Sequence, residues 1–219
     1  MDTNNSIERH AIRILFILYY CRSGTDSHKQ LGLFGDKDSY LDSETKLQKF
    51  DFWIRYPDYL AAALLHQCSQ GKYEENDIAK VKDIVRQIFH DQEPVLRNIP
   101  MRRYLRGAHE PLDNVTSFLS SRNLAYKRII GKGNRTHYYI TQKGMMAVTN
   151  ILQECPEAVW YKERCNVLHH FFGHLSGRAI KNIQYLEKEY ENTPLKQNIP
   201  SITKVVKKRF EVIFKEPVQ

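Results

Sequence analysis

Apolar side chains recur roughly every three to four residues over most of this chain, which is the spacing of one buried face of an amphipathic helix. Ile14, Leu15 and Leu18 form such a stripe in the first segment, which predicts a helix that Ser6 caps. The same spacing predicts further helices. One begins at Ser43, and the others cover 57–67, 74–89, 111–122, 141–153, 156 to about 177, about 177 to about 191, and 202–214.

Two segments in the middle of the chain break the helical pattern. Leu124–Ile130 and Arg135–Ile140 are rich in β-branched and aromatic side chains, and the glycine-containing stretch between them is typical of a hairpin turn. Residues 23–42 contain three glycines and many polar side chains, which predicts a loop. The chain is therefore expected to be mainly α-helical with one small β-hairpin.

The order helix, strand, hairpin turn, strand, helix is that of a winged-helix domain. Pro111–Arg122 would be its recognition helix and Leu124–Ile140 its wing. The stretch Tyr138–Gly144 resembles the ending "Y-x-(I/L)-T-x-x-G" of many winged-helix proteins. We expect a helical segment over 1–92, the winged helix over 93–153 and a helical C-terminal region over 154–219. The first segment leaves open a second, degenerate winged helix, although it contains no clear hairpin.

Length and composition exclude several classes of protein. The longest apolar run, Ile14–Cys21, has eight residues, whereas a membrane span needs about 18 or more. The first residues carry neither the basic start nor the cleavage site of a secretory signal. The four cysteines show no pattern, which favours reduced thiols. We therefore expect a cytoplasmic protein without a membrane contact.

The positive charge is concentrated in one stretch. The formal net charge is +8, and residues 97–143 hold ten Lys and Arg against two acidic residues, so the rest of the chain is neutral. An excess confined to one segment indicates a surface built for an anion. Because the wing lies in this segment, double-stranded DNA is the expected partner, and a wing that contacts only protein is the alternative.

The DNA-contacting residues expected from this argument lie before, on and after the recognition helix. Arginine and lysine contact phosphates, and polar side chains on an inserted helix reach base edges. The predicted set comprises Arg102, Arg103, Arg106, Asn114, Arg122, Lys127, Arg128, Lys132 and Arg135, with Thr116 and Ser117 as further candidate base readers.

A cluster of cysteine and histidine residues near position 170 contains side chains of the kind that bind zinc. Cys165 and His169, and His170 and His174, are pairs four residues apart, but the two pairs do not share one helix face. We interpret them as parts of a packed or partly exposed helix. No catalytic set and no metal or cofactor site are expected, and an enzyme would require this cluster or the loop before Lys46 to act as a site.

An aromatic group precedes and follows a proline in the second and third predicted helices. Trp53, Tyr56 and Tyr59 belong to it, together with Phe50 and Phe52. We expect these side chains to lie in the core or at an interface with a partner protein rather than to stack on bases.

Two segments carry a resemblance to a known family. One is Lys46–Leu60, in which "K-L-x-F-L-(L/I)-R-Y-P" is met in part over Lys49–Pro57. The other runs from Arg103 to Leu124, with Asn123 where the family usually has glycine. Together with the wing, they resemble the middle component of bacterial ABC-type three-component systems, related to the small winged-helix subunit of Lamassu-type anti-phage complexes.

This resemblance implies a non-catalytic accessory subunit. Such a subunit would bind an SMC-like ABC ATPase and DNA, and would restrain a nuclease-type effector subunit until foreign DNA is sensed. The competing hypothesis is a free-standing, homodimeric winged-helix transcription regulator, because such regulators pair two recognition helices on neighbouring half-sites.

Overall fold

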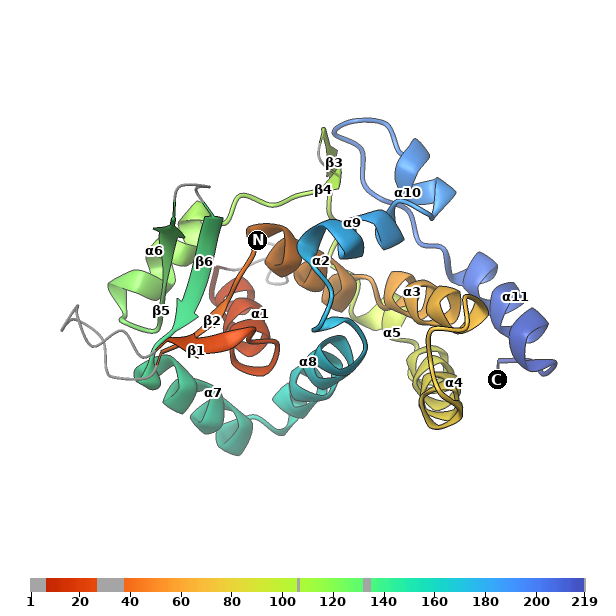
Figure 1. Cartoon of the computed structure of the whole chain (residues 1–219), viewed down its shortest axis with the longest axis horizontal. Helices are drawn as coiled ribbons and strands as arrows, with labels where there is room; N and C mark the ends of the chain where they lie inside the picture. Colours follow the sequence, from red (N-terminus) through yellow and green to blue (C-terminus); the bar gives the residue numbers. More distant parts are fainter. Residues whose placement is uncertain (1–6, 27–37, 106, 132–134, 219) are drawn as a thin grey trace. The chain divides into compact units, whose positions relative to one another are not determined.

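The computed structural model in Figure 1 describes residues 7–26, 38–105, 107–131 and 135–218. It is mainly helical with a small antiparallel sheet, as expected. The helices are α1 (Ile7–Tyr20), α2 (Glu44–Arg55), α3 (Pro57–Ser69), α4 (Glu75–His90), α5 (Glu93–Leu96), α6 (Asp113–Ser121), α7 (Gln142–Glu154), the 3₁₀ turn η2 (Pro156–Ala158), α8 (Val159–Phe172), α9 (Gly177–Gln184), α10 (Lys188–Asn192) and α11 (Thr203–Phe214). The strands are β1 (Gly24–Asp26), β2 (Asp38–Leu41), β3 (Arg103–Tyr104), β4 (Gly107–Ala108), β5 (Ala125–Ile130) and β6 (Arg135–Ile140). No helix in these described ranges has the length and apolar character of a membrane span.

The chain folds into two compact units, and each unit combines stretches that are far apart in the sequence. Unit 1 contains residues 1–51 and 110–181, and unit 2 contains residues 52–109 and 182–219. The chain thus leaves unit 1 within α2 and returns just before α6. This division differs from the three consecutive segments expected from the sequence, because long-range packing rather than chain order defines each unit.

The sheet of unit 1 has the strand order β1-β2-β6-β5 and is antiparallel throughout (Figure 1). The predicted hairpin is present as β5 and β6, with Ala125 opposite Ile140. The prediction of a loop over 23–42 is wrong at both of its described ends, where β1 and β2 form. β2 is short and polar, and it becomes a strand because its backbone pairs with β6, with Leu41 opposite Tyr138.

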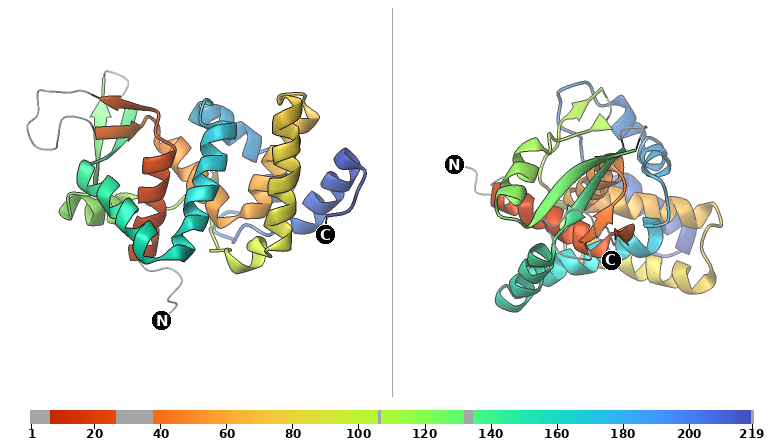
Figure 2. Two further views of the ribbon diagram at one scale, coloured as in Figure 1. Left: turned by 90° about the horizontal axis from the view of Figure 1, so that it is seen from below. Right: turned by 60° about the vertical axis from the view of Figure 1, so that its left-hand side comes forward.

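Helices cover the sheet of unit 1 with their apolar stripes. α1 packs against β2, β6, α6, α7 and α8, and α6 packs against β5 (Figure 2). The predicted stripe of Ile14, Leu15 and Leu18 is fully buried. The expected cap of α2 is also confirmed, since Ser43 Oγ accepts a hydrogen bond from the Lys46 amide. Ser6 lies outside the described residues.

The turn between α6 and β5 holds the sheet against the next helix. Asn123 adopts a left-handed conformation with φ of +56°, which asparagine tolerates and glycine usually supplies. Thr141 Oγ1 donates to the Asn123 carbonyl at 2.7 Å and accepts from the Gly144 amide at 3.0 Å, so it caps α7 as expected. Within the Tyr138–Gly144 motif, Thr141 and Gly144 therefore join the α6–β5 turn to the first turn of α7.

Unit 2 is built around α3, which packs against α4, α5 and α11 (Figures 1 and 2). Phe52, Tyr56, Tyr59 and Tyr190 form its aromatic centre, with ring centroids 4.7 to 6.1 Å apart. The Tyr56 hydroxyl donates to the Ile199 carbonyl and accepts from the Met101 amide. Aromatic rings therefore fill the core, and their polar ends tie down the loop before α11.

The partner interface predicted at Trp53, Tyr56 and Tyr59 is not on the surface. Each of these side chains is at most 2% exposed within the chain itself. The correction has a simple cause: α2 and the first two turns of α3 are buried on nearly all sides, so their aromatic residues belong to the core rather than to one outward face.

The segments that carry the family resemblance are used to hold the fold together. Arg55 donates to the carbonyls of Ile99 and Pro100, and Asp58 accepts from Ser201 and the Ile202 amide. In the second segment, Arg103 donates to the Thr193 carbonyl at 2.6 Å. Arg55, Asp58 and Arg103 therefore have structural roles within unit 2.

Candidate nucleic-acid interface

The helix–hairpin pair of unit 1 combines an apolar inner side with a polar outer side. α6 buries Val115, Thr116 and Leu119 against the rest of the unit. Asn114 and Ser117 remain exposed on the same helix. Thr116 is not a base reader, because it is buried and its hydroxyl donates to the Leu112 and Asp113 carbonyls at the start of its own helix. α6 thus keeps two of its three predicted base-reading positions accessible.

Three predicted cations lie exposed on α6 and the hairpin. Arg122 closes α6, where its guanidinium stacks 3.7 Å from the Phe118 ring centroid and donates to the Phe118 carbonyl. Lys127 on β5 donates to Asp113 of α6 at 2.6 Å. Arg135 begins β6 and is exposed. Lys127 lies beside Asp113 because α6 packs on β5, whereas Arg135 pairs with Ile130 at the far end of the hairpin.

The contact between Lys127 and Asp113 is electrostatic and open to solvent. The hydrogen bond from Lys127, and then its charge, lower the pKa of the Asp113 carboxyl below its usual value. Asp113 is 80% exposed and Lys127 46% exposed, so water screens the pair. Lys127 is therefore held near α6 by a weak contact, and a phosphate group can replace the carboxylate as its partner.

The remaining predicted cations are distributed differently. Arg128 is half-buried on the face of the hairpin opposite Lys127, and alternation along β6 places Arg135 on the same face as Arg128. Arg102 and Arg103 belong to unit 2, where Arg103 is committed to the Thr193 carbonyl and pairs through its backbone with Gln197. Arg103 thus has a structural role within unit 2, and its DNA contact stays a prediction. Arg106 and Lys132 lie outside the described residues.

The sheet face that carries Arg128 also carries a row of aromatic rings that the sequence did not reveal. The rings of Tyr126 and Tyr139 stack with centroids 4.9 Å apart, and those of Tyr40 and His137 stack at the same distance. Alternation along β5 and β6 places these side chains on one face. Tyr40 joins them only because β2 pairs with β6, and nothing in its local sequence predicts that pairing.

One group in the described part of unit 1 has the composition of a metal site. It consists of His10 on α1, Asp51 on α2 and Glu110 before α6. However, His10 Nε2 faces Asp51 at 4.0 Å while its Nδ1 faces Glu110 at 3.7 Å, so the two carboxylates lie at different ring nitrogens. Arg13 also donates to Asp51 at 3.0 Å. A guanidinium in this position opposes a second cation, so the cluster fits an internal charge network better than a metal ion.

The cysteine–histidine cluster does not gather into one site. Cys165 is fully buried on α8, and its carbonyl accepts from Cys21 Sγ. His169, His170 and His174 are exposed. The thiol therefore faces the core while the imidazoles face outward, including that of His169, the i+4 neighbour of Cys165.

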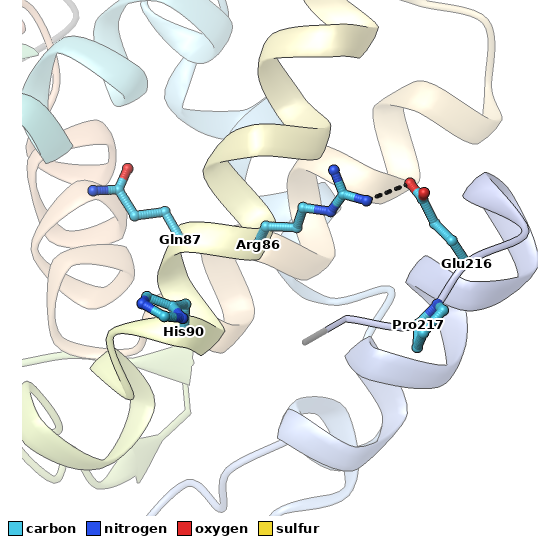
Figure 3. A pocket seen from close by; sticks show the side chains of 5 residues that line it. All are labelled: Arg86, Gln87, His90, Glu216 and Pro217. Atoms are coloured by element: carbon cyan, nitrogen blue, oxygen red, sulfur yellow. Dashed lines mark ion pairs between the residues drawn. The ribbon is translucent and has the colours of Figure 1, made fainter.

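Unit 2 contains a hollow of about 490 Å³ beside α4, lined by Arg86, Gln87, His90, Glu216 and Pro217 (Figure 3). Glu216 pairs with Arg86 at 2.8 Å and also with Lys82. Within this lining, the Glu216 carboxylate balances the charge of Arg86. This site therefore offers little net charge for a ligand.

Comparison with known proteins adds no relative to this picture. No protein-family model matches the chain, and no match was found among curated proteins or solved structures.

Proposed function

We propose that unit 1 is a winged-helix domain that binds double-stranded DNA, with α6 as the recognition helix and β5–β6 as the wing. The observation that carries this proposal is the sheet order β2-β6-β5. In a winged helix, the strand after the first helix pairs with the second strand of the wing. Here β2 follows α1 and pairs with β6, and α2 and α6 take the places of the second and third helices.

The proposed winged helix has an interrupted helix-turn-helix. A helix-turn-helix usually joins its two helices by a turn of roughly three to four residues. Here the chain passes through residues 52–109 of unit 2 between the first part of α2 and α6. The Gln48 side chain on α2 donates to the Glu110 carbonyl and accepts from the Glu110 amide. These two hydrogen bonds hold the ends of the inserted segment close together, which is the role of the turn in an uninterrupted helix-turn-helix.

DNA is the partner that the exposed side chains favour. Arg122, Lys127 and Arg135 present positive charge at the end of α6 and on the hairpin, and Asn114 is exposed on the helix. Phosphate contacts of this type supply salt-dependent affinity. The described residues of α6 and the hairpin contain one acidic side chain, Asp113, which Lys127 already neutralises.

We further propose that the chain is a non-catalytic accessory subunit of an SMC-like ABC ATPase complex that acts against phage or plasmid DNA, and that it restrains the effector of that complex. This proposal is supported by the sequence resemblance.

The DNA proposal is tested by removing two exposed cations together. The double variant Arg122→Gln/Arg135→Gln should bind a short duplex more weakly, and its salt slope of log K should be shallower by about 0.9 for each phosphate that is no longer neutralised. Fluorescence anisotropy at several salt concentrations measures both quantities. The matched control, Lys162→Gln/Arg178→Gln, removes two exposed cations of α8 and α9 and should leave both unchanged.

Equal affinity of the two double variants at low salt would contradict DNA binding through the wing. That result would favour the alternative in which the hairpin contacts only protein. Melting temperatures of both variants should stay close to that of the natural chain, because all four side chains are exposed.

A further inference from the structure

A second hollow lies in unit 1, on elements other than α6, β5 and β6. It has a volume of about 530 Å³, within the range of about 300–1,000 Å³ typical of small-molecule sites. Its lining comes from the segment after α1, the start of α2, the end of α8 and the connection to α9. The lining residues are Arg22, Ser23, Asp42, Lys46, His169, His170, Gly173, His174, Leu175 and Ser176.

Basic side chains dominate this lining. Arg22 and Lys46 are cations, and the three histidines of the α8 cluster each carry at least one N–H donor. The one carboxylate, Asp42, accepts from Ser23 Oγ at 2.9 Å and lies 3.4 Å from Lys46 Nζ. Asp42 and Lys46 therefore balance one another in charge, and Arg22 and the imidazole N–H groups are the donors that remain.

Lys46 is a fixed member of the site. Its side chain is 4% exposed, and its Nζ donates to the Gly173 carbonyl at 3.1 Å. Arg22, His169 and His174 are exposed around it. A buried, anchored ammonium group with exposed donors at the rim is a suitable arrangement for a multiply charged anion, whose oxygens accept from several directions.

A metal ion is not the occupant that this geometry favours. Within the described residues, the group of metal-ligating side chains close enough to share an ion is the one at His10, outside this hollow. Arg22 and Lys46 would also oppose a cation. The DNA-facing residues proposed above contribute nothing to the lining, which favours a separate small ligand over a nucleic-acid backbone.

We propose that this hollow binds a small phosphorylated molecule, with Lys46 as the anchored cation and Arg22, His169 and His174 as donors at the rim. His169, His170 and His174 then form the anion-binding side of the hollow. This inference does not depend on DNA binding by α6.

Pyrophosphate is the simplest probe of the site. Calorimetric titration of the full chain should give saturable binding, and Arg22→Ser should weaken it roughly tenfold or more, because a charge-assisted hydrogen bond is removed. The control Arg178→Ser removes an exposed arginine outside the lining and should bind like the natural chain. NMR spectra of histidine-labelled protein should show shifts for His169, His170 and His174 but not for His66 or His90.

Three outcomes would overturn the proposal. They are the absence of saturable binding at millimolar pyrophosphate, equal affinity of Arg22→Ser and Arg178→Ser, and NMR shifts confined to other histidines. A competition experiment distinguishes a small phosphorylated ligand from the phosphate backbone of DNA. If a short duplex displaces pyrophosphate and shifts the same three histidines, the hollow binds the DNA backbone, and the assignment to a small ligand is wrong.

Discussion

Burial, rather than distance, decides what an ion pair contributes in this protein. The pair of Arg13 and Asp51 is 3.0 Å apart with both side chains 1% exposed. The pair of Lys127 and Asp113 is shorter, at 2.6 Å, yet both side chains lie in water. Removing one member of the buried pair leaves an unpaired charge in the protein interior, which solvates it poorly. In the exposed pair, water takes the place of the missing partner.

We therefore expect Asp51→Asn to lower the free energy of unfolding by about 3–5 kcal/mol. The two Nη groups of Arg13 are buried without a hydrogen-bond partner among the described residues, so no other hydrogen bond there replaces the one to Asp51. Urea unfolding followed by circular dichroism measures the change. Asp113→Asn is the matched control and should leave stability almost unchanged.

Replacing both members of the buried pair shows whether the loss of stability in Asp51→Asn comes from an unpaired charge or from impaired packing. Arg13→Met/Asp51→Leu should recover much of the stability that Asp51→Asn removes, because no unpaired charge remains. A double variant no more stable than Asp51→Asn would show that shape, rather than charge, sets the cost at this position.

At the scale of elements, close backbone contacts fix how α7 leaves the sheet. Gly144 lies in the first turn of α7, and a Cβ atom there would be 2.1 Å from the Leu124 carbonyl oxygen and 2.8 Å from Ile140 Cγ1. Thr141 binds the same turn from the other side. The helix, the α6–β5 turn and the end of β6 therefore pack at a distance that only glycine allows.

Gly144→Ala should destabilise the protein by about 1–3 kcal/mol, the usual cost of overpacking a site that cannot relax freely. Gly71→Ala is the comparison, because Gly71 has φ of +63° with open space around it. Its cost should come from backbone conformation and should be partly recovered by Gly71→Asn, since asparagine tolerates the left-handed region. Unfolding midpoints that are unchanged in Gly144→Ala would contradict the close contact.

At the scale of the whole molecule, the chain leaves unit 1 within α2, and residues 52–109 form part of unit 2 before it returns ahead of α6. Unit 1 holds the exposed cations of α6 and the hairpin, and unit 2 has a core of aromatic rings with its own anchoring hydrogen bonds. Unit 2 also has exposed apolar side chains, including Val95, Leu96 and Leu105. The proposed function therefore leads us to expect DNA contacts on unit 1 and protein contacts on unit 2.

Gentle purification of the tagged chain from its native host should recover a large SMC-like ATPase in stoichiometric amount. Mass spectrometry identifies the co-purifying chains and their ratio. Recovery of the chain alone, as a dimer that carries DNA, would instead favour the homodimeric transcription regulator.

Local sequence determined most of the helices, because their apolar spacing, Ser43, Thr141 and the proline at the start of α3 act within a few residues. It also determined the β5–β6 hairpin and the left-handed turn at Asn123. Tertiary structure decided what depends on distant partners. β2 is a strand only beside β6, and Thr116 and Trp53 are buried only after packing. Glu110 joins His10, Arg13 and Asp51 only when the chain returns to unit 1. Spacing along a chain encodes near contacts, whereas burial and pairing across a hundred residues are properties of the folded molecule.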